Sequence, residues 1–175
     1  MANPTIRLAT PDDVDALARL KLETFRETFL EGFGVPYPPD DLAVFEAEAY
    51  GRDHVERELA DPERRTWVAH ADGDLLGYAH VGPTKLPHRE AEPHHGELYQ
   101  LYVRREAQGM KLGGRLLALA LDHLTVTRPG PILLGVWSGN LRAQAIYAAC
   151  GFVKVGEYQF PVGTWRDEEF IFRRP

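Results

Sequence analysis

A glycine-rich segment directly follows one of the apolar, strand-like runs of the chain. It reads Gln108, Gly109, Met110, Lys111, Leu112, Gly113 and Gly114. Where a strand passes through such a turn into a helix, the unpaired N–H groups and positive dipole end of the helix bind phosphate. Glycine lets backbone approach a pyrophosphate, and Lys111 adds a cation. The segment fits neither the dinucleotide nor the P-loop spacing, so it predicts a phosphate-binding turn of another kind. The alternative is a helix start whose glycines serve packing.

A second patterned segment, Trp137 to Phe152, contains N-x-x-A-x-x-x-Y-x-x-x-G-F, beginning at Asn140. Asn140 and Tyr147 lie two helical turns apart, so both side chains project from one helix face, with the small Ala143 between them. Together with Q-x-x-K-x-G from Gln108, this segment resembles the GNAT superfamily of acetyl-CoA-dependent N-acetyltransferases.

The resemblance covers the whole order of expected elements and implies a site for acetyl-CoA. The turn from Gln108 to Gly114 would hold the CoA pyrophosphate, and Asn140 would hydrogen-bond the pantetheine arm. The backbone groups that would pair with pantetheine as an added strand are those of Leu101, Tyr102 and Val103. Lys111 departs from the family pattern, which usually has glycine or alanine there, although the backbone N–H groups remain.

A narrower likeness is to the PaiA-type spermidine/spermine acetyltransferase branch. It is carried by Phe25-x-x-x-Phe29, the runs ELYQLYV and LLGVWSGNLRAQAIYAACGF, and the late Phe160-x-Val162-Gly163. This likeness implies a leaning toward a polyamine as the acetyl acceptor.

Acetyl transfer to an amine needs two groups that handle protons. An alkyl amine of pKa ~10 is protonated at neutral pH, so a base must free its lone pair, and the expelled thiolate needs an acid. Tyr147 is the expected acid, because a phenol of pKa ~10 keeps its proton at neutral pH and can give it to a thiolate of pKa ~8.5. The alternative is a core tyrosine that anchors its helix. The backbone N–H of Leu101 or Tyr102 is the expected donor to the oxyanion.

Glu97 is the expected base, because it opens the ELYQLYV strand, where some members of the family carry a base glutamate. Partial burial would raise its pKa toward the working pH. The alternative is a strand-end glutamate in solvent. Phe33, Tyr37 and Tyr99 are the expected aromatic walls of a site for a cationic substrate, the alternative being an apolar plug under a proline-rich loop.

The elements that must position these residues follow from periodicity and from turn residues. Helices are expected over residues 10–31, over 40–60 with an interruption at Gly51, over 112–125 and over 140–150. Strands are expected over residues 5–9, 66–70, 75–81, 97–103, 131–137, 152–160 and 166–173. The order β-α-α-β-β-β-α-β-α-β-β indicates an α/β (α+β) fold with a mixed, mostly antiparallel sheet flanked by helices, and its strand–helix–strand unit implies one parallel crossover.

Composition restricts the class of protein further. The 175 residues carry 20 basic and 26 acidic side chains, a net charge of −6, without the basic stripe of a nucleic-acid binder. No apolar run approaches the ~20 residues of a membrane span, and the N-terminus has no signal-peptide pattern, so we expect a cytoplasmic protein that binds neither nucleic acid nor membrane. The length suits a single domain over residues 1–175.

The remaining reactive side chains predict no further chemistry. Cys150 is the only cysteine, which excludes an internal disulfide and a zinc-type cysteine cluster. The loop with His88, His94 and His95 is expected to hold no metal, because adjacent His94 and His95 would point to opposite faces of an extended chain. The final hairpin, Phe152 to Arg173, is a candidate surface for a homodimer.

The sequence thus favours acetyl transfer from acetyl-CoA to a small amine by direct attack in a ternary complex. Three alternatives stay open. The acceptor could be a protein or peptide N-terminus or a lysine, in which case a shallow groove beside Glu97 is expected. The domain could bind CoA as a sensor without turnover, or it could be a structural partner module with an exposed apolar patch.

Overall fold

The computed structural model describes residues 3–175 and confirms the expected order of elements. The helices are α1 (Val14–Phe25), α2 (Pro39–Tyr50), α3 (Arg52–Ala60), α4 (Leu112–Thr127) and α5 (Leu141–Ala149). The strands are β1 (Thr5–Leu8), β2 (Arg65–Ala71), β3 (Asp74–Pro83), β4 (Gly96–Val103), β5 (Ile132–Trp137), β6 (Val153–Val162) and β7 (Trp165–Arg174). The expected interruption at Gly51 separates α2 from α3.

The first helical segment differs in type from the continuous helix expected over residues 10–31. A 3-10 turn, η1 (Pro11–Asp13), precedes α1, and a π-helical segment, η2 (Arg26–Gly32), follows it. The hydroxyl groups of Thr24 and Thr28 donate to the carbonyl oxygens four residues earlier, at 2.8 and 2.7 Å. Hydrogen bonds from a side-chain hydroxyl to the carbonyl four residues earlier weaken the regular backbone hydrogen bonds and often bend a helix. Single π-helical turns often occur at functional sites.

The seven strands form one sheet in the order β1-β2-β3-β4-β5-β7-β6. Every pair is antiparallel except β4–β5, which is the parallel crossover that the sequence predicts. This mixed, mostly antiparallel sheet with flanking helices confirms the predicted fold class. The last strand in the chain, β7, inserts between β5 and β6.

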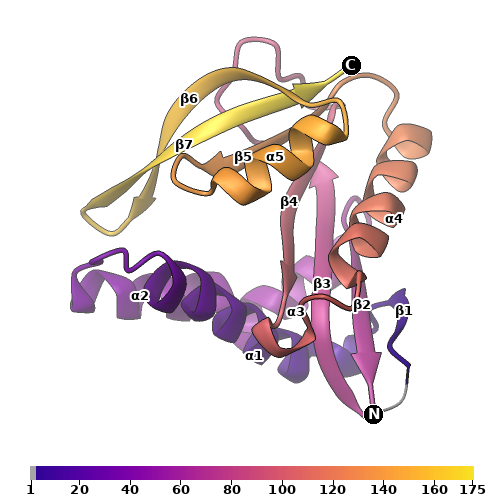
Figure 1. The fold of residues 1–175 in the computed structure, drawn as a ribbon, viewed down its shortest axis with the longest axis vertical. Coiled ribbons are helices and arrows are strands. Elements are labelled where there is room, and N and C mark those ends of the chain that lie inside the picture. Colours follow the sequence, from indigo (N-terminus) through magenta and orange to yellow (C-terminus); the bar gives the residue numbers. More distant parts are fainter. Residues whose placement is uncertain (1–2) are drawn as a thin grey trace.

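Helices cover both faces of the sheet. The apolar face of α4 packs against one face of the β2–β5 region and forms the largest core cluster. Helices α1 and α3 cover the other face through a smaller cluster around Leu17, Leu20 and Val55. Figure 1 shows that the β5–β7–β6 part of the sheet turns away from the β1–β4 part, with α5 beside the opening.

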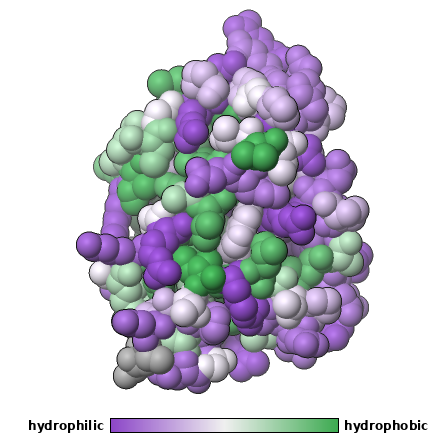
Figure 2. Space-filling model, turned by 90° about the vertical axis from the view of Figure 1, so that its right-hand side faces the viewer, coloured by the Kyte–Doolittle hydropathy of each residue, from purple (hydrophilic) through white to green (hydrophobic). Residues whose placement is uncertain are grey.

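The surface on the α4 side is mixed in character. Figure 2 shows hydrophobic residues gathered over the middle of this face, with hydrophilic residues around them. Exposed apolar side chains of α4 and α5 include Leu119, Val126, Leu141 and Ile146. None of the helices within residues 3–175 combines the length and the apolar character that a membrane span needs.

Candidate active site

The opening in the sheet begins where β4 and β5 cease to pair. The two strands are in register only from Gly96–Ile132 to Leu98–Leu134. From Tyr99 onward, the edge of β4 that faces β5 has no strand partner within the described chain. Unpaired strand edges accept an extended partner through backbone hydrogen bonds.

A β-bulge in β4 lies at the same point. Leu98 pairs with Val81 and Gln100 with His80, so Tyr99 is an extra residue in the ladder. One extra residue reverses the inward and outward alternation of a strand. Because of the bulge, both Leu98 and Leu101 face the core under α4, whereas the rings of Tyr99 and Tyr102 lie on the opposite side.

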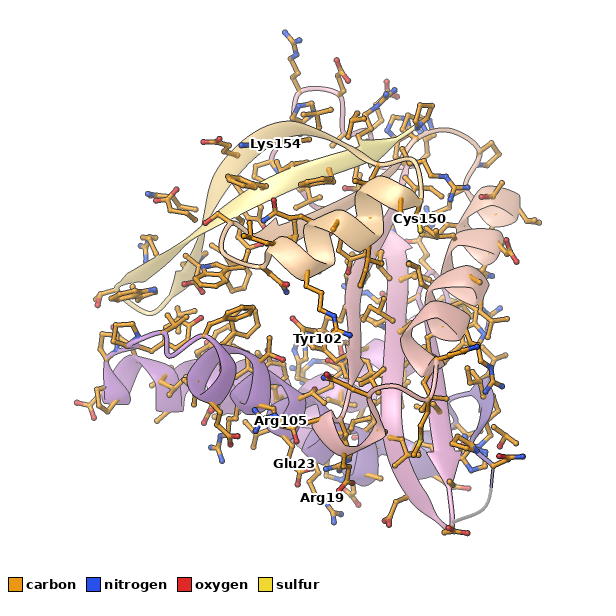
Figure 3. The ribbon with its side chains drawn as sticks, viewed as in Figure 1. Arg19, Glu23, Tyr102, Arg105, Cys150 and Lys154 are labelled. Carbon is orange, nitrogen blue, oxygen red and sulfur yellow. The ribbon has the colours of Figure 1, made fainter. Side chains whose placement is uncertain are left out.

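A cavity of about 540 Å³ occupies this opening, a volume suited to a small molecule. Six of the seven tyrosines line it, namely Tyr37, Tyr50, Tyr99, Tyr102, Tyr147 and Tyr158. Its carboxylates are Glu58, Glu97, Asp167 and Glu169. Of these residues, Tyr102 lies on β4 beneath α5 (Figure 3). The cavity is therefore both acidic and aromatic, which favours a cationic occupant.

The turn from Gln108 to Gly114 leads from β4 into α4 without a capping side chain and without an acidic residue in the first helical turn. Its unpaired N–H groups are thus free to meet an anion. Gly109 has φ +90° and Lys111 has φ +60°, the left-handed conformation that glycine adopts most easily. Lys111 is thus a non-glycine residue held in a conformation that favours glycine.

The two glycines at the start of α4 leave open space. A Cβ atom at Gly114 would meet no atom within 4 Å, and one at Gly113 would meet only Val103 Cγ2, at 3.8 Å. Internal packing therefore does not require glycine at either position. The space fits a bound pyrophosphate, so the turn fits the CoA group that it is predicted to hold.

Asn140 and Tyr147 both line the cavity, with Ala143 between them. Asn140 caps α5, because its Oδ1 accepts a hydrogen bond from the Ala143 N–H at 3.0 Å. Its Nδ2 group has no partner within residues 3–175 and remains available to a ligand. Burial, followed by the proximity of Cys150, raises the pKa of Tyr147 to about 12, so this phenol keeps its proton at neutral pH.

Glu97 is buried, with 7% of its surface exposed, and also lines the cavity. Its Oε2 accepts hydrogen bonds from the Lys85 N–H at 2.7 Å and from the Thr84 hydroxyl at 3.1 Å. Burial raises the pKa of Glu97, and these hydrogen bonds oppose the rise only in part. The side chain is therefore not the solvated strand-end glutamate that the sequence left as an alternative.

Two of the three expected aromatic walls line the cavity. Tyr37 donates from its hydroxyl to Asp167 Oδ2 at 2.6 Å, and the ring of Tyr99 lies under the Lys85 ammonium, 4.4 Å from its centroid. Phe33 lies elsewhere: it is 38% exposed, and its ring centroid is 4.6 Å from that of Trp137. The structure thus brings Tyr37 and Tyr99 to one cavity, whereas Phe33 is not among its lining residues.

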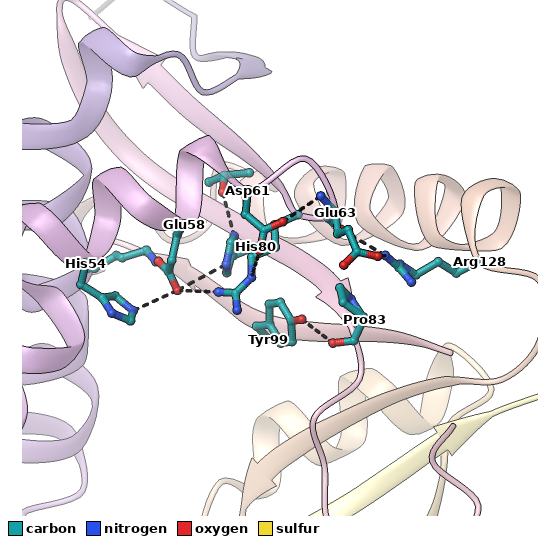
Figure 4. Close-up of polar contacts among 11 residues, drawn as sticks. His54, Glu58, Asp61, Glu63, His80, Pro83, Tyr99 and Arg128 are labelled. Carbon is teal, nitrogen blue, oxygen red and sulfur yellow. Dashed lines mark hydrogen bonds and ion pairs between the residues drawn. The ribbon is translucent and has the colours of Figure 1, made fainter. Parts of the chain in front are cut away.

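One end of the cavity is closed by an ionic network around Glu58 (Figure 4). Glu58 pairs with the buried Lys21 through Oε2 and lies 3.2 Å from His54 and 3.4 Å from His80 through Oε1. Burial alone would raise the pKa of Glu58, but the His80 hydrogen bond and the Lys21 charge outweigh it and hold the pKa well below its usual range. This carboxylate is ionised and its charge is compensated.

Sequence reasoning missed two carboxylates, Asp167 and Glu169 on β7. They are two positions apart in a strand, so both face the cavity, while Glu168 between them points outward. Burial, with the nearby Asp167 charge, raises the pKa of Glu169 to about 8. The run of three consecutive acidic residues in the last strand was a usable signal, but the strands that flank β7 decide what each of its faces meets.

A group of potential metal ligands lies outside the cavity. Glu92, His94 and His95 place one ligand atom each within 4.8 Å of one another. The backbone turns here, and the two imidazole rings lie 4.5 Å apart instead of on opposite faces of an extended chain. The Nδ1 atom of His95 already accepts the Glu92 N–H at 3.2 Å, and we assign this turn no part in the chemistry of the cavity.

The family model described as Acetyltransferase (GNAT) family matches residues 22–152 of the chain. An uncharacterized N-acetyltransferase in the pepI 3' region of Lactobacillus delbrueckii subsp. lactis is 28% identical over 149 residues, which cover 85% of this chain and 86% of that protein. The N-alpha-acetyltransferase RimI of Mycobacterium tuberculosis is 36% identical over 100 residues, or 57% of this chain and 59% of that protein. Matches to mycothiol acetyltransferases span only 27% to 34% of those longer proteins.

Among solved structures, the PaiA N-acetyltransferase from Thermoplasma acidophilum in complex with coenzyme A shares the fold. Its TM-score is 0.75 at 20% sequence identity, and the alignment covers 99% of each chain. The whole sheet with its flanking helices is thus common to both proteins.

Proposed function

Because this chain belongs to the GNAT family of acetyltransferases, we propose that it transfers the acetyl group of acetyl-CoA to a primary amine of a small molecule, by direct attack in a ternary complex. The observation that carries this proposal is the cavity of about 540 Å³, lined by phenols and carboxylates, at the point where β4 and β5 separate. Its volume suits a small acceptor, and its charge suits a cation.

The residues around the opening would hold acetyl-CoA, whose thioester supplies the acyl group. The start of α4, from Gln108 to Gly114, would bind the pyrophosphate through backbone N–H groups, with Lys111 as an added cation. The free edge of β4 at residues 101–103 would pair with the pantetheine arm, and the Asn140 Nδ2 group would donate to the same arm.

Two side chains are proposed to handle protons. Glu97 accepts the proton of the acceptor ammonium, since burial raises its pKa toward the range in which a carboxylate works as a base. Tyr147 donates its phenolic proton to the leaving sulfur. A backbone N–H of Leu101 or Tyr102, on the unpaired edge of β4, is the proposed donor to the oxyanion.

A polyamine is the leading acceptor. Its several ammonium groups match a cavity with four carboxylates, and the fold is shared with a protein named PaiA N-acetyltransferase. A protein or peptide N-terminus is the second candidate, favoured by the similarity to a protein named N-alpha-acetyltransferase RimI. A sensor that binds CoA without turnover is the third, and the cavity-lining Asn140 and Tyr147 argue against it.

The test is a thiol-release assay with acetyl-CoA against polyamines, amino acids, aminoglycosides and short peptides. We expect turnover of spermidine or spermine with a kcat/KM at least about tenfold above that of any peptide. Turnover of peptides alone would replace the small-amine acceptor by a protein acceptor. Binding of acetyl-CoA without turnover of any amine would favour the sensor.

We further infer a homodimer formed through the hairpin of β6 and β7. Strand β6 is an edge of the sheet and exposes Val153 by 58% and Phe160 by 36%. Edge strands with exposed apolar side chains favour pairing with another chain. Sedimentation at high micromolar concentration is expected to give the mass of two chains, whereas a monomer at that concentration would disprove the dimer.

A further inference from the structure

Two carboxylates on the inner face of β7 have no cationic partner. Asp167 accepts hydrogen bonds from the Tyr37 hydroxyl at 2.6 Å and from Trp165 Nε1 at 2.9 Å, both neutral donors. The Glu169 carboxylate makes no hydrogen bond and no ion pair with any residue of 3–175, although Glu169 lines the cavity. Two neighbouring carboxylates of this kind are unfavourable in their ionised form unless a ligand supplies a positive charge.

The neighbours of Glu169 in the sheet and in the cavity are aromatic or acidic side chains. In the sheet it lies opposite Trp137 on β5 and opposite Tyr158 on β6. After burial, its charge raises the pKa of Tyr102 on β4, and after burial and Asp167 it also raises the pKa of Tyr37. None of these neighbours, on any packed element, carries a positive charge.

The basic side chains of the cavity lie at its other end. His54 and His80 face Glu58, and the Lys85 ammonium lies over Tyr99 and lowers the pKa of Glu97. Both oxygens of Glu58 and one oxygen of Glu97 are already engaged. Of the four carboxylates, those on β7 are therefore the ones that a bound cation would neutralise.

Tyr158 lies near both Glu169 on β7 and Glu97 on β4. Its hydroxyl lies against Gly135 of β5, where a Cβ atom would come within 2.8 Å of the phenol oxygen. After burial, the charges of Glu169 and then Glu97 are the groups that raise its pKa, so its ring is near both. Phenol rings beside a carboxylate present π faces and oxygens that suit an alkylammonium group.

We propose that Glu169, with Asp167 beside it, binds an ammonium group of the acetyl acceptor other than the nitrogen that is acetylated, and so selects a cationic acceptor. The proposal rests on the proposed function and adds that two carboxylates of the cavity have different roles. Glu169 acts in binding, and Glu97 acts in the removal of the proton.

Acceptor binding is then linked to pH. Because the pKa of Glu169 is raised to about 8, the free protein near pH 7 holds this carboxyl mostly protonated. A cation binds the ionised form, so one proton leaves Glu169 as the ammonium enters. The kcat/KM for the acceptor therefore rises as the pH increases through about 8.

The test compares Glu169→Gln with Glu97→Gln and with the control Glu168→Gln. Glu168 lies on the outward face of β7 and accepts a hydrogen bond from Gln159 at 2.6 Å, so its variant removes the same charge outside the cavity. With the best amine of the panel, Glu169→Gln should raise the acceptor KM by at least about tenfold, with kcat within about twofold of wild type. Glu97→Gln should lower kcat instead, and Glu168→Gln should match the wild type.

Calorimetry supplies a readout apart from turnover. When spermidine binds at pH 7 in buffers of different ionisation enthalpy, the wild type should release close to one proton and Glu169→Gln none. The affinity for CoA should be equal in the two proteins. Glu169→Asp keeps the charge, and it should retain the proton release with an intermediate KM if the glutamine variant does not fold.

Two results would overturn the proposal: an unchanged acceptor KM in Glu169→Gln, or a fall in kcat at unchanged KM, which would make Glu169 the base. These results differ from a failure of the proposed function. In that case the wild type itself would turn over no amine, whereas here the wild type is active and only the effect of the variant is absent.

Discussion

Replacing Tyr147 with phenylalanine is expected to lower kcat roughly 100-fold, because a positioned general acid contributes about 10²–10⁴ to such a step. The wild-type phenol has its pKa raised to about 12 by burial, so it holds its proton over the whole neutral and mildly alkaline range. Without the phenol, the CoA sulfur must leave as an unprotonated thiolate or take its proton from water. The KM values for acetyl-CoA and amine should change little, since the ring stays in place.

The stability of this variant should not change. The Tyr147 hydroxyl makes no hydrogen bond within residues 3–175, and its ring packs on Phe152, 6.0 Å between centroids. Phenylalanine keeps that contact, so thermal unfolding should match the wild type. Tyr78→Phe is the control for activity, because it removes a phenol oxygen from a buried ring that does not line the cavity. A Tyr147→Phe protein with wild-type kcat would exclude Tyr147 as the acid and would favour the alternative in which the domain binds CoA as a sensor.

Placing a carboxylate at the start of α4 is expected to abolish acetyl-CoA binding while preserving the fold. In Gly114→Asp, the new side chain enters space where a Cβ meets no protein atom within 4 Å. An acidic residue in the first helical turn stabilises a helix by about 0.3–1 kcal/mol, and aspartate also has a higher helix propensity than glycine. Thermal unfolding should therefore occur at the same or a slightly higher temperature.

The same carboxylate would repel a pyrophosphate. Two like charges about 4 Å apart near a protein surface cost about 4 kcal/mol, so the KM and Kd for acetyl-CoA should rise at least about 100-fold. Gly114→Ala is the control: it adds a methyl group without charge and should raise the KM by less than about tenfold. If Gly114→Asp bound acetyl-CoA as tightly as wild type in calorimetry, the pyrophosphate would not lie at the start of α4.

The sequence alone determined the features that depend on local interactions. The order of strands and helices, the break at Gly51 and the turn from Gln108 to Gly114 follow from periodicity, helix caps and glycine content. Each of these signals acts between residues a few positions apart. The pair Asn140 and Tyr147 was found in the same way, since the helix by itself places both side chains on one face.

Only the tertiary structure decided what surrounds those residues. Tyr99 is an extra residue only in the pairing of β4 with β3, so the β4 sequence alone does not show the bulge. The bulge nevertheless decides which β4 side chains face the cavity. The π-helical segment after Phe25 likewise has no signal in the apolar spacing on which the expected continuous helix was based.

The acidic residues of β7 show the limit most clearly. Antiparallel pairing places β7 between β5 and β6, so that Glu169 lies opposite Trp137 and Tyr158. That neighbourhood is made of residues from distant parts of the chain, and burial among them is what raises the pKa of Glu169 to about 8. A strand's own sequence sets which residues share a face, but the strands beside it decide whether that face meets solvent, core or substrate.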